Sequence, residues 1–511
     1  MEIELKLLLD PAAKARLLRH RLLIRHAVGK PERAKTLAVY FDTPEFDLLR
    51  HRAGLRVRES AGAWRQTMKA GGGALAGLHQ RHEWEGPVDG ALPDLPRLRH
   101  MVGSHSPWTA MLAAPALAER LRPQFTVRVT RSTWQLEVDG DAIELVLDEG
   151  TLEREGVRLP ICEIELELVS GRPERLYALA LELLADLPLR LDHGNKAERG
   201  YALCLPPASR ARKARPFELA RRTSVEAGVQ TILGNCLAQI QDNEAGTLQG
   251  RDAEYLHQMR VGLRRLRCAL TLFDAVAPCP ATLQGEIDWL GGVLGAARDW
   301  DVLSNSTAAM LGAAPGGEQQ LALLKPLLGA MVEQHHAQVA QALLSPRYAA
   351  LLLNLGGWLL GARWRDGADP AITRQLDSPL RQFADDTMTR GQRRLLKRGR
   401  GIADADAQGL HRLRIAVKKN HYAAQFFNAF YRPKQVKAYI AALAALQDQL
   451  GWRNDVAVAD GLLRQLPQTE PADAAATGFA RGYLLARLDQ GRQPLREAWR
   501  AVRALTLPGA A

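Results

Sequence analysis

The chain has 511 residues, of which 47% are hydrophobic, and its 68 lysines and arginines outnumber 56 acidic residues to give a formal net charge of +12. This length is too great for one hydrophobic core, so two or three globular domains are expected. The longest apolar stretch, 349–362, is interrupted by Asn354, Gly356 and Gly357 and falls short of the roughly 18 residues that a membrane-spanning helix needs. A membrane protein is therefore not expected.

The five cysteines are odd in number and scattered, without the paired spacing of a zinc site. This pattern favours reduced thiols over a disulfide framework. We therefore expect the protein to be cytoplasmic.

The first residues alternate charged and apolar side chains. Successive side chains of a β-strand point to opposite faces, so Glu2, Glu4 and Lys6 share one face. A single charged strand face is most often simply solvated, but at least five later segments repeat the alternation. These segments are 55–59, 67–69, 82–85, 143–148 and 161–168.

The apolar faces of these strands require burial, for which the amphipathic segments 12–23 and 174–184 are available. The charged faces must then meet water or one another. A closed antiparallel barrel with an ionic lumen satisfies both faces and leaves no open sheet edge. Such a lumen is costly unless metal ions and a polyanion fill it. The sequence therefore predicts an α+β N-terminal part, an antiparallel β-barrel with flanking helices.

Over residues 1–205 the chain resembles the CYTH superfamily, the triphosphate tunnel metalloenzymes. That superfamily includes inorganic, thiamine and RNA triphosphatases and class IV adenylate cyclases. The resemblance rests on the Glu2-x-Glu4-x-Lys6 motif, on the Arg56 and Arg58 strand, and on segments 40–43, 162–167 and 193–201.

The resemblance implies an inorganic triphosphatase that depends on Mg²⁺ or Mn²⁺, with Glu2 and Glu4 holding a metal that bridges the phosphates. A second metal and the attacking water would be held or oriented by Asp148, Glu163 and Glu165. The phosphoryl oxygens would be clamped by Lys6, Arg56, Arg58, Lys69, Arg131 and Lys196. Phosphoryl transfer depends on positioning and charge neutralisation more than on covalent chemistry, so these residue types suit the reaction.

Residues 206–217 are rich in proline and positive charge, which is typical of a linker. Beyond them a 3.6-residue periodicity replaces the strand alternation, so an all-α domain is expected over 218–505. Residues 215–511 contain 36 Lys and Arg against 27 Asp and Glu, so most of the positive charge lies in this part.

The helical part repeats itself. Segment 256–267 aligns with 410–421 at an offset of 154, and 294–299 aligns with 450–455 at an offset of 156. The duplication predicts two related helical bundles, over about 218–370 and 371–505.

Each copy of the repeated helix carries a basic stripe at helical spacing. The first stripe is His257, Arg260, Arg264 and Arg267, and the second is His411, Arg414, Lys418 and His421. Basic stripes without acidic partners suit phosphate chains. These residues resemble the CHAD domain, a helical module associated with polyphosphate and often fused to CYTH. The resemblance implies that both stripes bind polyphosphate, and that the protein could associate with polyphosphate granules.

Three further features are read as local. Ala457 stands in the second copy where the first has Asp301, so Asp301 is expected to serve a cap or an ion pair. The adjacent His335 and His336 are interpreted as structural. The basic run 393–400 is as consistent with an exposed loop as with a binding site.

Alternative functions stay open. A class IV adenylate cyclase would use the same tunnel but needs an adenine pocket, which cannot be identified in the sequence, and another organic triphosphatase would also fit. A non-catalytic polyphosphate or nucleic-acid binding protein is the other alternative, motivated by the basic helices. Nucleic acid is disfavoured because no aromatic residues are interleaved for base stacking.

Overall fold

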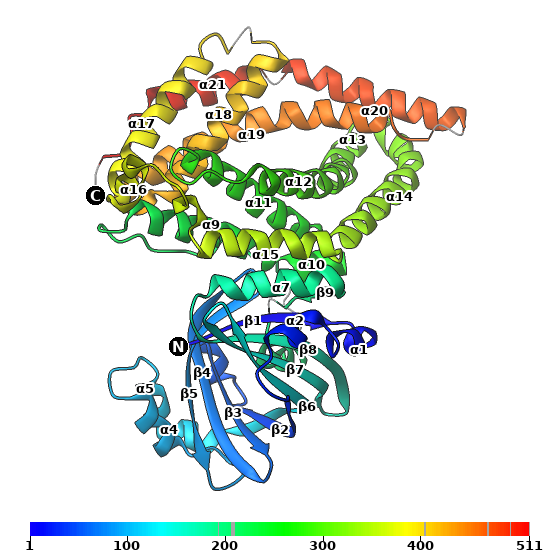
Figure 1. Ribbon diagram of the computed structural model, residues 1–511. Helices are drawn as coiled ribbons and strands as arrows, with labels where there is room; N and C mark the ends of the chain where they lie inside the picture. The colour runs from blue at the N-terminus through cyan, green and yellow to red at the C-terminus, as the bar shows by residue number, and fades with distance from the viewer. Residues whose placement is uncertain (193, 206–209, 403–404, 468–469, 491, 510–511) are drawn as a thin grey trace. The chain divides into compact units, whose positions relative to one another are not determined.

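The computed structural model describes residues 1–192, 194–205, 210–402, 405–467, 470–490 and 492–509 (Figure 1). The chain forms two compact units, one of residues 1–210 with 344–361 and one of residues 211–343 with 362–511. His193, in one of the motifs, and part of the expected linker lie outside the described residues. The boundaries 1–205, 206–217 and 218–505 therefore remain a proposal.

Nine strands make up the sheet of the first unit. They are β1 (Glu2–Leu9), β2 (Glu32–Asp42), β3 (Ala53–Ser60), β4 (Ala63–Leu75), β5 (Leu78–Val88), β6 (Arg122–Val138), β7 (Asp141–Arg154), β8 (Val157–Ser170) and β9 (Leu189–Leu191). The strand order is β5-β4-β3-β2-β6-β7-β8-β1-β9, and β5 also pairs with β1, so eight antiparallel strands close into a barrel. The predicted barrel is confirmed.

The alternation of the strands sets which side chains meet. In the register of the sheet Lys6 lies opposite Glu165, and Asp148 lies between Arg131 and Glu163 on its two neighbouring strands. Directly opposed side chains of antiparallel strands lie close enough to pair. Leu5, on the other face of β1, is fully buried.

Short helices surround the barrel. They are α1 (Lys14–Leu17), α2 (Arg21–His26), α3 (Asp47–Arg50), α4 (Leu95–Val102), α5 (Thr109–Ala113), α6 (Pro115–Arg120), α7 (Glu174–Asp186) and α8 (Lys196–Cys204). The expected helix 174–184 corresponds to α7, which packs against β1 and β8. The expected helix 12–23 is instead divided into a 3₁₀ turn, α1 and α2, because His20 has an extended conformation and its side chain caps α2.

One helix of the first unit comes from far along the sequence. Helix α15 (Pro346–Leu360) packs against α7 and β9. A Cβ atom added at Gly356 would lie 2.6 Å from the ring of Tyr177 on α7, so the absence of a side chain there permits the close approach. The second unit is consequently not continuous in sequence.

The second unit is all-helical, as predicted. Its helices are α9 (Val225–Gln241), α10 (Glu244–Gln249), α11 (Ala253–Phe273), α12 (Ala281–Val302), α13 (Ala308–Gly312), α14 (Gly317–Leu343), α16 (Pro370–Asp377), α17 (Leu380–Arg398), α18 (Ala407–Phe426), α19 (Pro433–Leu463), α20 (Pro471–Gln490) and α21 (Arg492–Ala504). None of the described helices is both long and apolar enough to cross a membrane.

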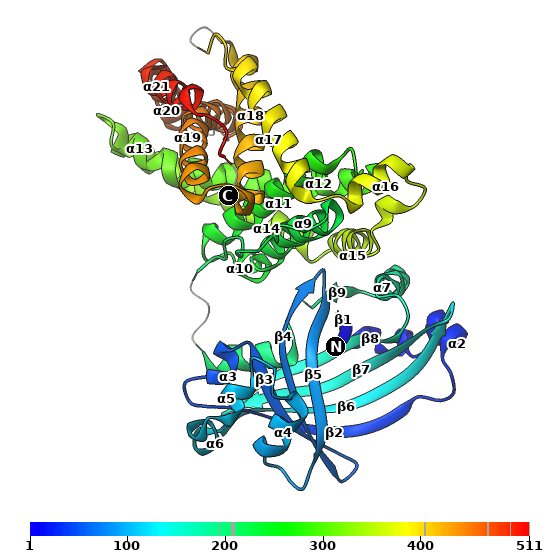
Figure 2. The same ribbon diagram turned by 90° about the vertical axis from the view of Figure 1, so that its left-hand side faces the viewer.

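The two copies of the repeat share their packing. Helix α11 lies between α9 and α12, as α18 lies between α17 and α19, and α11 and α18 contact each other. Figure 2 shows α17 and α18 side by side. The two copies therefore meet through the helices that carry the basic stripes.

Candidate metal and phosphate site

Three carboxylates converge inside the barrel. Asp148 on β7 and Glu163 and Glu165 on β8 are all buried, and one oxygen atom from each lies within 4.8 Å of the others. They meet because Asp148 lies opposite Glu163 in the strand register and Glu165 follows on the same face of β8. Such a group of hard oxygen donors can hold a divalent cation.

Three cations surround these carboxylates. The three carboxylates and the three cations together are called here the lumen cluster. Lys196 Nζ lies 2.7 Å from Asp148 Oδ2 and 3.0 Å from Glu165 Oε1, and it also pairs with Glu163. Arg131 donates to both oxygens of Asp148, at 2.8 and 2.6 Å. Lys6 pairs with Glu165.

The cations keep Asp148 and Glu165 ionised. Burial alone would raise the pKa of Asp148, but Lys196 and Arg131 lower that pKa to about 2. The pKa of Glu165 is likewise held well below its usual value, against burial, by Lys196 and Lys6. Asp148 and Glu165 are therefore fixed charges compensated by cations, and neither must be deprotonated to bind a metal.

Lys196 is positioned by the start of α8. The side chain of Asn195 caps the helix by accepting a hydrogen bond from Glu198 N at 3.0 Å. One and a half turns later, Tyr201 donates to Asp42 Oδ2 at 3.0 Å. Asp42 is completely buried and also accepts three backbone N–H groups, from Thr43, Leu48 and Leu49. The segment 40–43 thus anchors α8 and does not reach the lumen cluster through Asp42.

The predicted first metal pair has a different environment. Glu2 accepts from Lys69 Nζ at 2.6 and 2.7 Å, and its pKa is raised to about 8 because burial outweighs the attraction of Lys69. Glu4 pairs with Lys6 at 3.0 Å, and although burial opposes it, Lys6 and Lys69 lower its pKa to about 2. Neither residue belongs to the three-carboxylate group, so their role as metal ligands stays a prediction.

The two arginines of β3 lie on the same strand face but differ in their partners. Arg58 pairs with Glu85 at 3.2 Å, and Glu85 also accepts from Thr67 at 2.8 Å. Arg56 lies opposite Tyr40 in the strand register. Its buried Nε has no hydrogen-bond partner among the residues that the structure describes, so this cationic donor remains available to an anion.

Sequence reasoning missed Arg199, which pairs with Glu163 and lies 3.6 Å from Asp192. The signal was present, because Arg199 is three residues after Lys196 and therefore on the same side of α8. It brings a further cation to the lumen cluster.

Four residues of the basic stripes converge in the second unit. Lys418 on α18 has its pKa lowered to about 7, first by burial and then by Arg264, Arg414 and Arg260. Arg260 reaches Asp299 at 3.1 Å, while Nε of both Arg264 and Arg414 is buried without a partner in the described part of the chain. These four residues are called here the basic cluster residues.

The other stripe residues lie apart from this convergence or at its margin. The pKa of His257 is lowered by burial and by Arg298, and that of His421 by burial. Arg267 is exposed and pairs with Asp288 at 2.7 Å, and His411 is exposed. The stripe is therefore not uniform along either helix.

The features read as local have local partners. Asp301 pairs with His336 at 2.9 Å, and His335 stacks on Trp300 with ring centroids 5.9 Å apart. Both contacts lie within the second unit and hold α14 against α12.

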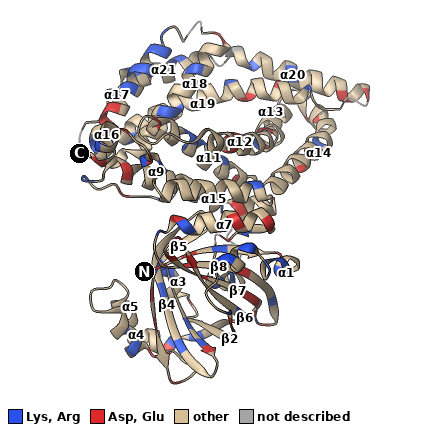
Figure 3. Cartoon of the chain, viewed as in Figure 1, with Lys and Arg blue, Asp and Glu red and all other residues tan. Residues whose placement is uncertain are grey.

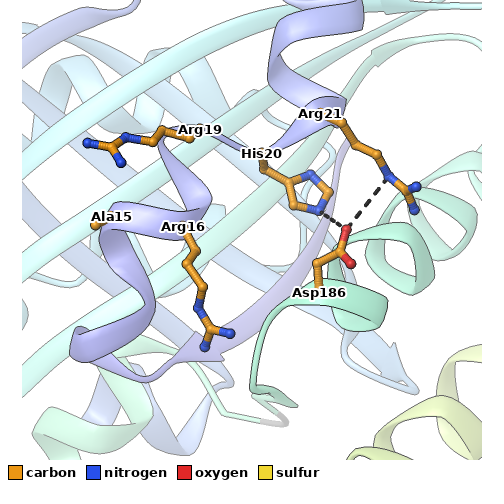
Figure 4. Close-up of a pocket in the computed structure, with 6 residues that line it drawn as sticks. All are labelled: Ala15, Arg16, Arg19, His20, Arg21 and Asp186. Atoms are coloured by element: carbon orange, nitrogen blue, oxygen red, sulfur yellow. Dashed lines mark hydrogen bonds and ion pairs between the residues drawn. The ribbon is translucent and has the colours of Figure 1, made fainter.

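A separate pocket of about 380 Å³ lies between α1, α2 and α7. Figure 4 shows His20 and Arg21 turned toward Asp186, which they approach to 3.0 and 3.6 Å. Its lining residues include none of the predicted site residues.

Comparison with known proteins matches each unit to a family. The CYTH domain model matches residues 1–201 and the CHAD domain model matches residues 231–464. The crystal structure of the CHAD domain from the plant Ricinus communis is 43% identical, covers 60% of this chain and 100% of that chain, and has a TM-score of 0.54. PptA from Streptomyces chartreusis is 17% identical, covers 54% of this chain and 99% of that one, and has a TM-score of 0.42, too low to carry an argument.

An inorganic triphosphatase from Haemophilus influenzae is 28% identical over 203 residues. The match covers 40% of this chain and 54% of that protein, so the chain spans about half the length of this curated relative.

An antiparallel barrel with an ionic interior, followed by a duplicated helical unit with converging basic residues, defines a two-domain class of protein. The chain belongs to the CHAD domain family, and it carries a CYTH domain ahead of that domain.

Proposed function

We propose that the protein is a hydrolase that depends on a divalent metal and splits inorganic triphosphate into diphosphate and phosphate. The observation that carries the proposal is the lumen cluster, in which three buried carboxylates lie within 4.8 Å of one another and are surrounded by cations. The similarity of residues 1–201 to the CYTH family and to an inorganic triphosphatase supports the same reaction.

The donor set fits Mg²⁺ or Mn²⁺, because among the described residues it consists of carboxylate oxygens alone. Two ions are proposed. Asp148, Glu163 and Glu165 would hold one of them, and Glu2 and Glu4 would hold the other. A divalent ion there would polarise a phosphoryl oxygen and lower the pKa of bound water.

The protein's own cations would bind and orient the phosphate chain. Lys6, Arg131 and Lys196 already lie beside the carboxylates, and Arg56 offers an unpaired donor. Further phosphoryl contacts are proposed for Arg58 and Lys69. Fixed charges inside a barrel need little reorganisation as the transition state forms, so they stabilise it better than solvent does.

The experiment is a phosphate-release panel on the purified full chain with Mg²⁺ or Mn²⁺. The substrates are triphosphate, long-chain polyphosphate, thiamine triphosphate and ATP. We expect triphosphate to be hydrolysed fastest, with one phosphate released per molecule and no release in EDTA. Formation of cyclic AMP from ATP without triphosphate hydrolysis would contradict the proposal and favour a cyclase.

We further propose that the second unit binds inorganic polyphosphate through the basic cluster residues, and that the protein is cytoplasmic and is thereby localised on polyphosphate. The convergence of these cations supports polyphosphate binding. Burial and their mutual repulsion lower the pKa of Lys418 and of Arg414, and a bound polyanion would stabilise the charged forms of both. Replacing all four by Gln should weaken binding of long-chain polyphosphate and flatten its dependence on salt. Unchanged affinity and salt slope would exclude this role.

A further inference from the structure

A groove lies at the turn between α17 and α18 in the second unit, apart from the basic cluster residues. It has a volume of about 790 Å³. The charged residues that line it are Arg394, Lys397, Arg398, Arg400, Asp406 and Arg412. Figure 3 shows Lys and Arg along the end of α17.

The basic residues of the groove come from three segments. Lys397 and Arg398 lie in the last turn of α17, where positive charge also offsets the negative end of the helix dipole. Their presence alone therefore indicates little. Arg400 joins them from the turn and Arg412 from α18, where no such dipole explanation applies.

Among the described residues, ion pairs do not neutralise the positive charge of the groove. Asp406, its acidic residue, caps α18 by accepting from Gly409 N at 2.7 Å. No carboxylate of the described residues forms an ion pair with Arg394, Lys397, Arg400 or Arg412. Uncompensated cations around a concave surface raise the local concentration of anions.

The backbone beneath the groove is fixed by α21. A Cβ atom added at Gly399 would lie 2.1 Å from the ring of Trp499, and Gln392 Nε2 donates to Leu505 O at 3.0 Å. Arg398 Nη1 donates to Arg412 O at 3.1 Å and so joins the two helices across the turn. The cations are therefore carried by a supported framework.

The groove is distinct from the basic cluster residues, although α18 contributes side chains to both. Arg412 and Arg414 are two residues apart on this helix, which places them about 200° apart around its axis. A ligand in the groove therefore contacts the opposite side of α18 from one held by Arg414 and Lys418.

We propose that this groove is a second binding site for a segment of inorganic polyphosphate. It takes a chain of phosphate groups because its recognition elements are cationic side chains, and no aromatic side chain lines it on which a nucleic-acid base could stack. A long chain that contacts both this groove and the basic cluster residues binds more tightly than it would bind either site alone.

Binding of long-chain polyphosphate to the full chain in EDTA tests the proposal. The groove variant replaces Arg394, Lys397, Arg400 and Arg412 by Gln. The matched control removes the same charge at exposed positions elsewhere in the second unit, by replacing Arg251, Lys325, Arg374 and Lys437 by Gln. We expect the groove variant to lose at least about tenfold in affinity and the control less than about twofold.

Equal affinity of the groove variant and the control would overturn the proposal. So would a groove variant that loses affinity for a single-stranded oligonucleotide but keeps its affinity for polyphosphate. The variant of the basic cluster residues is measured beside the groove variant and the control, and it separates this proposal from the previous one. If the variant of the basic cluster residues alone loses binding, the groove is not a site and the earlier proposal stands. If the groove variant alone loses binding, the groove is the site and the earlier proposal is wrong.

A second measurement uses the unaltered protein and so does not depend on the folding of a variant. Arginine labelling by phenylglyoxal is followed by mass spectrometry, with and without long-chain polyphosphate. We expect Arg400 and Arg412 to be protected at least about fivefold, and the exposed Arg374 to be unchanged. Equal labelling of all three would contradict the proposal.

Discussion

Lys196 lies where a metal ion would compete with it. Its Nζ pairs with all three carboxylates of the lumen cluster, at 2.7 and 3.0 Å to Asp148 and Glu165. A divalent cation held by the same oxygens would compete with this ammonium, which would then be able to pair with a phosphate. Lys196 therefore balances the charge of the carboxylates in the structure, and it is proposed to bind substrate when a metal ion is held there.

Replacing Lys196 by Met should consequently separate metal binding from catalysis. We expect the affinity for Mn²⁺, measured by calorimetry, to rise by about tenfold, equivalent to about 1.4 kcal/mol, because the competing cation is lost. Triphosphate hydrolysis should fall. The control is Lys14→Met, since Lys14 pairs with Glu149 at 2.7 Å and not with the cluster. Weaker Mn²⁺ binding by the Lys196 variant than by the control would contradict this assignment.

We expect Lys418 to make the proposed polyphosphate binding depend on pH. Burial and three neighbouring arginines lower the pKa of Lys418 to about 7, so its charge is present below that pH and is lost as the pH rises through it. A bound polyanion favours the charged form, so affinity should fall by about two- to tenfold between pH 6 and pH 8.

The measurement is the affinity for long-chain polyphosphate at both pH values, at one ionic strength. Lys418→Arg is the control, because arginine stays charged throughout this range. An equal pH dependence in both proteins would show that another group titrates.

At the scale of the elements, strand alternation was enough to predict the barrel and its charged interior. It placed Lys6 and Asp148 correctly on inward faces because a period of two leaves little freedom of register. Arg131, by contrast, was named only through the family resemblance. The role of Asp42 could not be predicted, since its partner Tyr201 is 159 residues away in sequence. The division of the expected helix 12–23 by a capping histidine was also missed.

The packing of helix α15 is the feature that could least be predicted from the sequence. Its apolar stretch and its paired glycines fit a buried helix, but periodicity cannot show against what a helix packs. The structure places it on α7, where Gly356 and Gly357 lie against Tyr177. A fragment of residues 1–205 lacks this helix, so the activity tests use the full chain.

Gly356→Val should therefore destabilise the first unit. The new Cβ atom would lie 2.6 Å from the ring of Tyr177 and 2.8 Å from Ala76, so α15 and α7 must separate. We expect a loss of about 1–3 kcal/mol in the free energy of unfolding, measured by denaturant titration. Gly329→Val in α14 is the control, because it introduces the same residue into a helix with nothing within 4 Å. Similar losses in both would show that α15 is not closely packed.

At the scale of the whole molecule, the chain divides its charge and chemistry between two units. The first contains the lumen cluster and the second contains the basic cluster residues and most of the net positive charge. Because residues 344–361 return to the first unit, the chain passes between the units three times. The units are therefore joined by more than a simple linker, which composition alone could not indicate.

The carboxylates of the lumen cluster are proposed to support triphosphate hydrolysis with a divalent metal. Glu165→Gln keeps the shape of the side chain and removes its charge. Glu149→Gln does the same on the opposite face of the adjacent strand, where Glu149 pairs with Lys14. With triphosphate and saturating Mg²⁺, we expect the Glu165 variant to lose at least about 100-fold in kcat while the Glu149 variant stays within about threefold of the unaltered protein. Near-normal hydrolysis by a folded Glu165→Gln protein would show that the lumen cluster is not the catalytic site.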